Sequence, residues 1–191
     1  MKKIFIFILL MSFIGITPAF AADADDFTKT INLFKESPAV NKFFNNCYGY
    51  AVFPTVGKAG FVVGGSFGKG QVYRQGELTG KAKLVEGSIG FQLGGKAFSE
   101  IIFFQDKRAY DEFISGQFEF DAQAQVTVIT AGAQAQAGTS GAGAGASAGP
   151  KTAAHAESNY FKGMATFIHS KGGLMYEASI SGQKFKFDPI K

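Results

Sequence analysis

Two glycine-rich stretches contain the residues whose types and spacing come nearest to a phosphate-binding loop. Residues 60–74 read GFVVGGSFGKGQVYR, and residues 90–97 read GFQLGGKA, in which the first and third glycines and the lysine have P-loop spacing. Gly70 in the first stretch and Ala97 in the second stand where the motif needs a magnesium-binding hydroxyl. The residues after Ala97 predict a strand, whereas a P-loop leads into a helix. We therefore expect no nucleotide site and no cofactor.

Other residues that could do chemistry are few and far apart in the sequence. His155 and His169 have no close metal-ligand spacing, and Cys47 is the only cysteine, which excludes an internal disulfide. We expect Cys47 to be a buried small hydrophobe. Glu119 and Asp121 fall on the polar side of a predicted strand, where a solvated surface is the ordinary interpretation. The sequence thus predicts no catalytic residue, no metal site and no enzyme.

The start of the chain has the pattern of an export signal. Lys2 and Lys3 precede an apolar run, which is followed by a small-residue cleavage pattern, so we expect residues 1–21 to be a signal peptide. The remaining 17 basic and 15 acidic residues give a net charge of about +2, which offers no reason to expect nucleic acid as a partner. The expected location is periplasmic or secreted, with the protein soluble or peripheral on a membrane.

The hydrophobic pattern predicts an α+β domain. Residues 25–47 have helical periodicity with Pro38 at the start of a second helix, and Asp106 can cap a further short helix. Most of the rest reads as short strands separated by glycines, so we expect a predominantly antiparallel sheet, barrel- or sandwich-like, with a few flanking helices. The helices' apolar sides are expected to cover the sheet, and membrane contact is the alternative.

After Gly116, apolar and polar residues alternate from Phe118 to Val128, which predicts one long half-buried strand. An Ala/Gly-rich insert follows at about residues 131–150, and we expect a flexible excursion or a long hairpin tip there. Residues 22–191 are long enough for one domain and hardly for two.

Four segments carry a resemblance to a known family. They are KAGFVVGGSFGKGQVYR at residues 58–74, GSIGFQLGGKAFSEIIFF at 87–104, AYDEFISGQFEFDAQAQVTV at 109–128 and SKGGLMYEASISG at 170–182. In this order they resemble the secreted bacterial branch of the SYLF lipid-binding domain family. The resemblance implies a non-enzymatic protein of the bacterial envelope that associates with lipid. An extra glycine at Gly172, and Glu177 in place of a common glycine, depart from the family pattern.

A basic β region gives the lipid hypothesis a physical basis. If strand register brings its cations to one face, each contributes about 1 kcal/mol of attraction to an anionic membrane. The alternative is an ordinary solvated charged face, and for Phe61 and Phe67 the core is the first assignment and insertion into lipid the second. We expect binding of anionic phospholipid; a structural or protein-interaction module of the envelope without lipid binding is the alternative. The predicted lipid-binding residues are Lys58, Lys69, Arg74, Lys81, Lys83 and Lys96.

Overall fold

The computed structural model describes most of the chain beyond the predicted signal peptide. The described residues are 24–60, 63–89, 94–120, 125–130, 133–138, 159–171, 180 and 182–190. The predicted signal peptide at 1–21, Phe61, and most of the predicted Ala/Gly-rich insert lie outside them.

Three helices have the positions that the sequence predicts. Helix α1 spans Ala24–Lys35, and α2 spans Pro38–Asn46 with its proline in the first turn. Helix α3 spans Lys107–Ile114, and its N-cap Asp106 accepts a hydrogen bond from the Ala109 backbone N–H at 2.8 Å. This cap satisfies one of the free amide groups at the helix start, so the prediction for Asp106 is confirmed.

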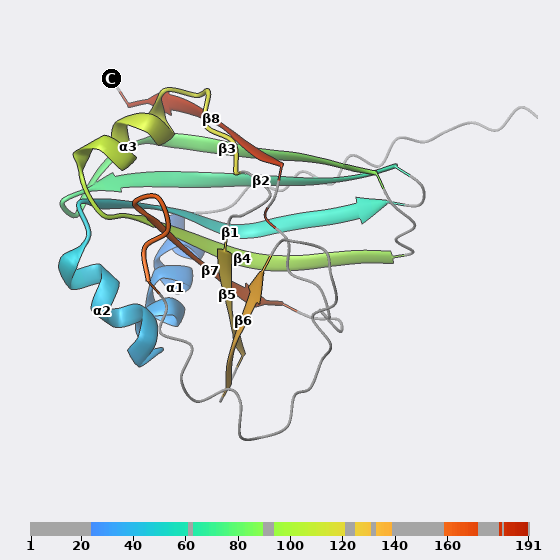
Figure 1. Cartoon of the computed structure of the whole chain (residues 1–191), viewed down its shortest axis with the longest axis horizontal. Helices are drawn as coiled ribbons and strands as arrows, with labels where there is room; N and C mark the ends of the chain where they lie inside the picture. The colour runs from blue at the N-terminus through green and yellow to red at the C-terminus, as the bar shows by residue number, and fades with distance from the viewer. Residues whose placement is uncertain are drawn as a thin grey trace, which may run out of the picture.

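Among the described residues, eight strands form one sheet, in the order β6-β5-β7-β4-β1-β2-β3-β8. Every neighbouring pair is antiparallel except β5 and β7, which are parallel. Figure 1 shows β8, β3, β2, β1 and β4 side by side, with α1 and α2 on one side of the sheet and α3 near β8. The predicted α+β class with a mainly antiparallel sheet is confirmed. The strand bounds are β1 Gly49–Gly60, β2 Val63–Arg74, β3 Glu77–Ile89, β4 Gly94–Phe104, β5 Gln125–Thr130, β6 Ala133–Gly138, β7 Met164–Ser170 and β8 Gln183–Pro189.

The sheet curls so that β8 approaches β1 across its inner face. The rings of Phe53 on β1 and Phe185 on β8 lie 5.7 Å apart, although β2 and β3 separate these strands in the sheet. The Phe120 backbone N–H donates to the Gln183 carbonyl on β8 at 3.1 Å. Five residues after Phe120 the chain enters β5, near the other end of the strand order.

Strand alternation divides the apolar residues between two cores. The inner face of the curl contains Phe53, Leu84, Ile102 and Phe185, closed off by Phe113 of α3. The outer face carries a second, mainly aromatic cluster on β1, β4 and β7, which α1 and α2 cover. Its members include Phe43 of α2, whose ring lies 5.5 Å from Phe103 and 5.0 Å from Phe167. The predicted packing of the two N-terminal helices on the sheet is confirmed.

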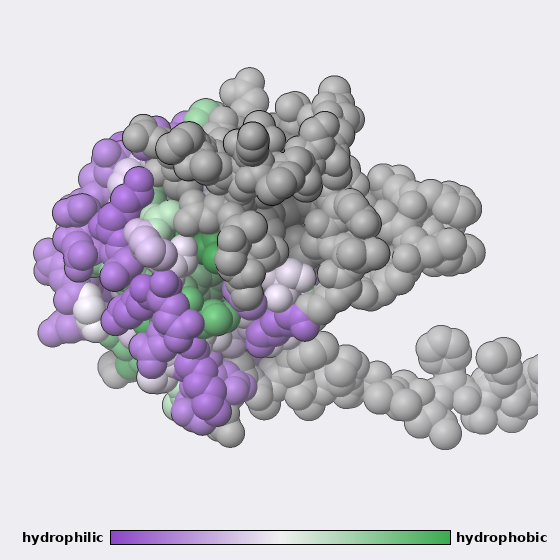
Figure 2. Space-filling model, turned by 90° about the horizontal axis from the view of Figure 1, so that it is seen from below, coloured by the Kyte–Doolittle hydropathy of each residue, from purple (hydrophilic) through white to green (hydrophobic). Residues whose placement is uncertain are grey.

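The helices keep their polar sides outward. Seen from below in Figure 2, the described residues at this end of the molecule are mostly hydrophilic, with small hydrophobic areas between them and the grey atoms. No helix within the described ranges is long and apolar enough to span a membrane.

The glycine-rich stretch forms strand β2, not a loop, as the sequence predicts. A side chain at Gly70 would place its Cβ 2.5 Å from the Phe53 ring and 2.9 Å from the Val52 carbonyl oxygen. A side chain at Gly68 would likewise place its Cβ 2.9 Å from the Val56 side chain. The glycines of β2 thus leave room for the large side chains of β1 inside the curl.

The predicted long strand after Gly116 differs from the observed structure. Glu119 makes an isolated bridge with Lys184, residues 121–124 lie outside the described part, and the regular strand β5 begins only at Gln125. Thr127, predicted on a polar face, is buried, because both faces of the sheet are covered at this point. Within the predicted insert, residues 133–138 form β6, which pairs with β5 as a hairpin.

Candidate functional site

A row of lysines crosses three neighbouring strands on the outer face of the sheet. Lys69 on β2 lies opposite Lys83 on β3, and Lys83 lies opposite Lys186 on β8. The three residues are exposed. Directly opposed like charges destabilise a sheet, so this row is costly for folding alone. We call the outer face of β2, β3 and β8 around this row the lysine face.

Two large apolar side chains adjoin the row on the lysine face. Phe67 and Val85 lie opposite each other on β2 and β3, and their exposed fractions are 42% and 53%. Lys184 lies opposite Val85 on β8. The expectation that Phe67 belongs to the core is wrong, because strand alternation turns it outward together with Lys69. An exposed aromatic ring beside a row of ammonium groups suits an interface between water and lipid.

Acidic residues neutralise only part of the lysine face. Lys83 pairs with Asp188 at 3.2 Å, and Lys184 pairs with Glu119 at 3.3 Å. Both ion pairs are about half exposed, and exposed pairs of this kind contribute little to stability. Together, the five lysines and two acids leave a positive charge of about +3. The lysines are Lys69, Lys81, Lys83, Lys184 and Lys186, and the acids are Asp188 and Glu119.

The structure does not bring all six predicted lipid-binding residues together. Lys69, Lys81 and Lys83 are exposed on the lysine face. Arg74 is exposed at the end of β2, opposite Glu77 in the β2–β3 hairpin. Lys96 pairs in register with Lys58, and its side chain lies outside the described part.

The prediction that Lys58 lies at the centre of an exposed patch is wrong. Its ammonium Nζ lies 2.8 Å from Glu86 Oε1, and the Lys58 side chain is only 17% exposed. The irregular register of β1 between Val52 and Val56 precedes it, and alternation from the buried Val56 turns Lys58 toward the inner face. Lys58 therefore belongs to the interior.

The interior partner of Lys58 is a deeply buried carboxylate. The Glu86 side chain is 2% exposed, and its second oxygen accepts a hydrogen bond from Ser66 Oγ at 2.9 Å. In register, Lys58 lies opposite Ser66, Ser66 opposite Glu86, and Glu86 opposite Gln183. These four residues form a polar row across β1, β2, β3 and β8 inside the curl.

A second buried carboxyl, Glu100, lies near this row. It is completely buried on β4, and Gln183 Nε2 donates to its Oε2 at 3.3 Å. Burial raises the pKa of Glu100 to about 8; the Gln183 hydrogen bond opposes this rise, and the charge of Glu86 adds to it. This raised pKa favours the neutral carboxylic acid over the carboxylate at pH 7.

Sequence reasoning missed several of these residues. The alternation in QKFKFDP at residues 183–189 was a usable signal, because it places Lys184 and Lys186 opposite in direction to Phe185. Glu100, a single charge inside the apolar run SEIIFF, was another. Nothing in the local sequence indicates that Lys58 faces inward, because that depends on the irregular register of β1.

Ser66 also occupies a pattern typical of a catalytic serine. Residues 64–68 read GGSFG, which has the spacing of a nucleophile elbow. The elbow requires a sharp turn from a strand into a helix, whereas residues 64–68 continue within β2. Ser66 Oγ is buried and donates to Glu86, and no histidine contacts it within the described residues. The arrangement is structural.

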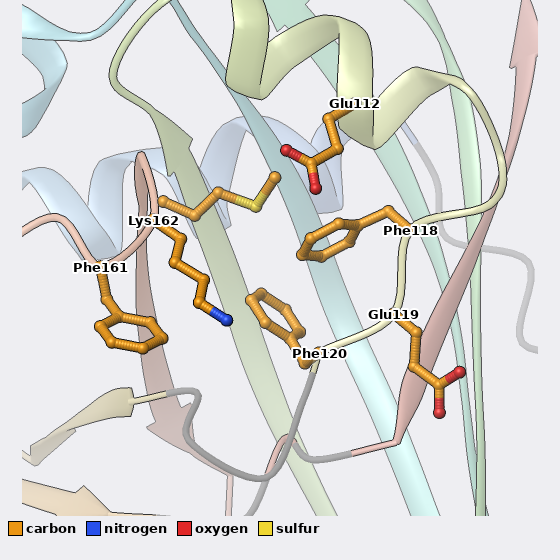
Figure 3. Close-up of a pocket in the computed structure, with 7 residues that line it drawn as sticks. Glu112, Phe118, Glu119, Phe120, Phe161 and Lys162 are labelled. Carbon is orange, nitrogen blue, oxygen red and sulfur yellow. The ribbon is translucent and has the colours of Figure 1, made fainter.

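A small pocket opens beside α3 (Figure 3). Its volume is about 50 Å³, and Lys162 extends toward the Phe120 ring within it, while Glu119 points away. Pockets for drug-sized ligands measure about 300–1,000 Å³. This pocket has room for a few water molecules and not for a cofactor. Its lining residues are Glu112, Phe118, Glu119, Phe120, Phe161, Lys162 and Met164.

The remaining reactive residues form no cluster in the described part. Cys47 is half-buried against the aromatic cluster, and burial raises the pKa of its thiol to about 11, so the thiolate is scarce at neutral pH. Across the described ranges, no group of three or more His, Cys, Asp or Glu residues could hold a metal ion. His169 lies on β7, and His155 lies outside the described part.

Comparison with known proteins gives one distant relative. No family model matches the chain. The chain is 29% identical over 164 residues to a protein of Aeromonas veronii described as Beta cell expansion factor A. The matching region covers 84% of this chain and 54% of that protein, so the chain spans about half the length of the curated relative it matches.

Proposed function

We propose that this protein binds anionic phospholipid surfaces, peripherally and without catalysis, through the lysine face. The observation that carries the proposal is the cross-strand row of Lys69, Lys83 and Lys186 beside exposed Phe67 and Val85. The lysines supply attraction to phosphate groups, and the two apolar side chains supply contact with the acyl region.

The arrangement of the face supports this function over a solvated charged surface. The outer side of β1, β4 and β7 is covered by α1 and α2, whereas Phe67 and Val85 remain exposed on the strands beyond. Side chains from three adjacent strands share this face, and a membrane offers an extended anionic surface that several of them can meet at once. The resemblance to the SYLF lipid-binding domain family and the export signal in the sequence agree with the proposal.

Vesicle co-sedimentation tests the proposal directly. We expect the protein without residues 1–21 to bind anionic phosphatidylglycerol vesicles at low salt, and binding to weaken as salt is added, since screening shortens electrostatic attraction. Changing Lys69, Lys83 and Lys186 together to Gln removes three charges worth about 1 kcal/mol each near the membrane. The affinity is expected to fall about 100-fold, or about 30-fold if the Lys83 ion pair already offsets its charge.

A matched variant removes the same charge elsewhere. Lys29, Lys35 and Lys42 lie on α1 and α2, and changing these three to Gln is expected to leave vesicle binding nearly unchanged. Equal losses in both triple variants would show a general charge effect with no defined face. Absence of binding by the unaltered protein to any anionic vesicle would contradict lipid binding itself and favour a protein-interaction module of the envelope.

A further inference from the structure

Two buried side chains meet across the interior of the curled sheet. Glu100 on β4 and Gln183 on β8 are both 0% exposed, and Gln183 Nε2 donates to Glu100 Oε2 at 3.3 Å. In the sheet order, β1, β2 and β3 separate β4 from β8. The contact therefore joins strands that have no backbone pairing, and it ties β8 to the middle of the sheet.

The second carboxyl oxygen of Glu100 and the amide oxygen of Gln183 have no hydrogen-bond partner among the described residues. These atoms are Glu100 Oε1 and Gln183 Oε1, and both are buried. An ionised carboxylate and an amide oxygen are acceptors only, so the ionised pair leaves both atoms unsatisfied. Each unsatisfied buried polar group costs about 1–3 kcal/mol, and more when it is charged. A single added proton reduces the number of unsatisfied atoms, because a carboxylic acid has one O–H donor.

We propose that Glu100 is a proton-binding site, held neutral by a cyclic acid–amide pair with Gln183. Glu100 Oε1 carries the proton and donates it to Gln183 Oε1, while Gln183 Nε2 donates to Glu100 Oε2. One proton thus gives both unsatisfied oxygens a partner. The proton exchanges with water, and no other reactant takes part.

The surroundings of the pair favour the neutral acid. The charged groups that face this part of the interior are Glu86 on β3 and Lys58 on β1, and they are paired with each other at 2.8 Å. In register beside Glu100 lie Phe53 on β1 and Ile168 on β7, both apolar and buried. Glu100 therefore lacks a cation of its own within the described residues, and the Glu86 charge opposes its ionisation.

The proton site makes stability depend on pH in a defined window. The pKa of Glu100 is raised from 4.5 to about 8 in the folded protein. Between these values the folded state holds a proton that the unfolded state has lost, so stability falls as pH rises. The contribution is fully present below about pH 4.5, and its loss is complete above about pH 8. This inference does not depend on lipid binding.

Infrared spectroscopy and chemical unfolding test the site together. At pH 6.5, exposed carboxyls are ionised, so a carboxylic-acid C=O band in the folded protein reports a buried acid. We expect this band in the wild type, its loss on titration through about pH 8, and its absence in Glu100→Gln. The unfolding constant is expected to rise by up to about tenfold per pH unit between pH 5 and 8 in the wild type relative to Glu100→Gln.

The variants are chosen to separate the site from general effects. Glu100→Gln keeps the shape and allows an amide–amide pair with Gln183 that needs no titrating proton. Glu112→Gln removes an exposed carboxyl from α3 and is expected to leave both the band and the pH dependence unchanged. A wild-type protein without an acid band at neutral pH overturns the proposal, whatever the variants do. A band that persists in folded Glu100→Gln overturns it as well.

Discussion

Lys58→Met is expected to lower the free energy of unfolding by about 3–5 kcal/mol, measured by urea denaturation at neutral pH. The substitution keeps an apolar stem of similar length and removes the ammonium group 2.8 Å from Glu86 Oε1. Glu86 then remains buried as a charge, and among the described residues the Ser66 hydroxyl is left as its hydrogen-bond partner. A buried carboxylate without a cation has lost its hydration and gained no attraction in return, which explains the size of the effect.

Removing the charge of Glu86 instead is expected to lower the free energy of unfolding by less. In Glu86→Gln the ammonium group of Lys58 loses its partner, but the Lys58 side chain is 17% exposed, compared with 2% for Glu86. A long flexible side chain at the edge of the interior can turn its charged end into water. We therefore expect a loss of about 1–3 kcal/mol, smaller than that of Lys58→Met.

The double variant Lys58→Met/Glu86→Leu is the matched control. It removes both charges, and replacing a buried ion pair by apolar residues is often neutral or stabilising. We expect its stability to lie within about 1 kcal/mol of the wild type, the Ser66 hydroxyl losing its acceptor. A double variant that is less stable than Lys58→Met alone would show that the two side chains are not coupled in the folded protein.

The same ion pair marks the limit of what the sequence could predict. The elements follow from local signals: Pro38 and Asp106 mark helix starts, and glycine-punctuated apolar runs predict strands. The two sides of each strand also follow from alternation, but a common face for Lys69 and Lys83 was predicted only on condition of the register that the pairing of β2 with β3 supplies. Each of these signals depends on interactions between residues that are only a few positions apart in the sequence.

Cross-strand neighbours are decided by register, which is not local. Lys58 is three residues beyond the irregularity in β1, and a shift of one residue there reverses the face of every later side chain. Lys186, absent from the predicted site, joins the lysine row only through the pairing of β3 with β8, more than 100 residues apart in sequence. Glu100 and Gln183 meet because the sheet curls, and sheet curvature has no short sequence signature.

Gly70→Ala is expected to destabilise the protein by about 3 kcal/mol, at the upper end of the usual cost of overpacking. The new Cβ would lie 2.5 Å from the Phe53 ring and 2.9 Å from the Val52 carbonyl oxygen. The ring is fully buried between β2 and Phe185, and the carbonyl belongs to the backbone of β1, so neither yields cheaply. Thermal and urea unfolding measure the loss.

Gly87→Ala on β3 provides the comparison, because a Cβ there meets no atom within 4 Å and the residue is exposed. An alanine restricts the unfolded chain more than glycine, so we expect no loss, or a gain of up to about 1 kcal/mol. Gly70→Ala combined with Phe53→Leu should recover part of the Gly70→Ala loss if the ring is the obstacle. Equal effects of Gly70→Ala and Gly87→Ala would contradict a steric role for Gly70. The loss at Gly70 would then reflect only the strand propensities of glycine and alanine, and room for the Phe53 ring would not explain why glycine stands there.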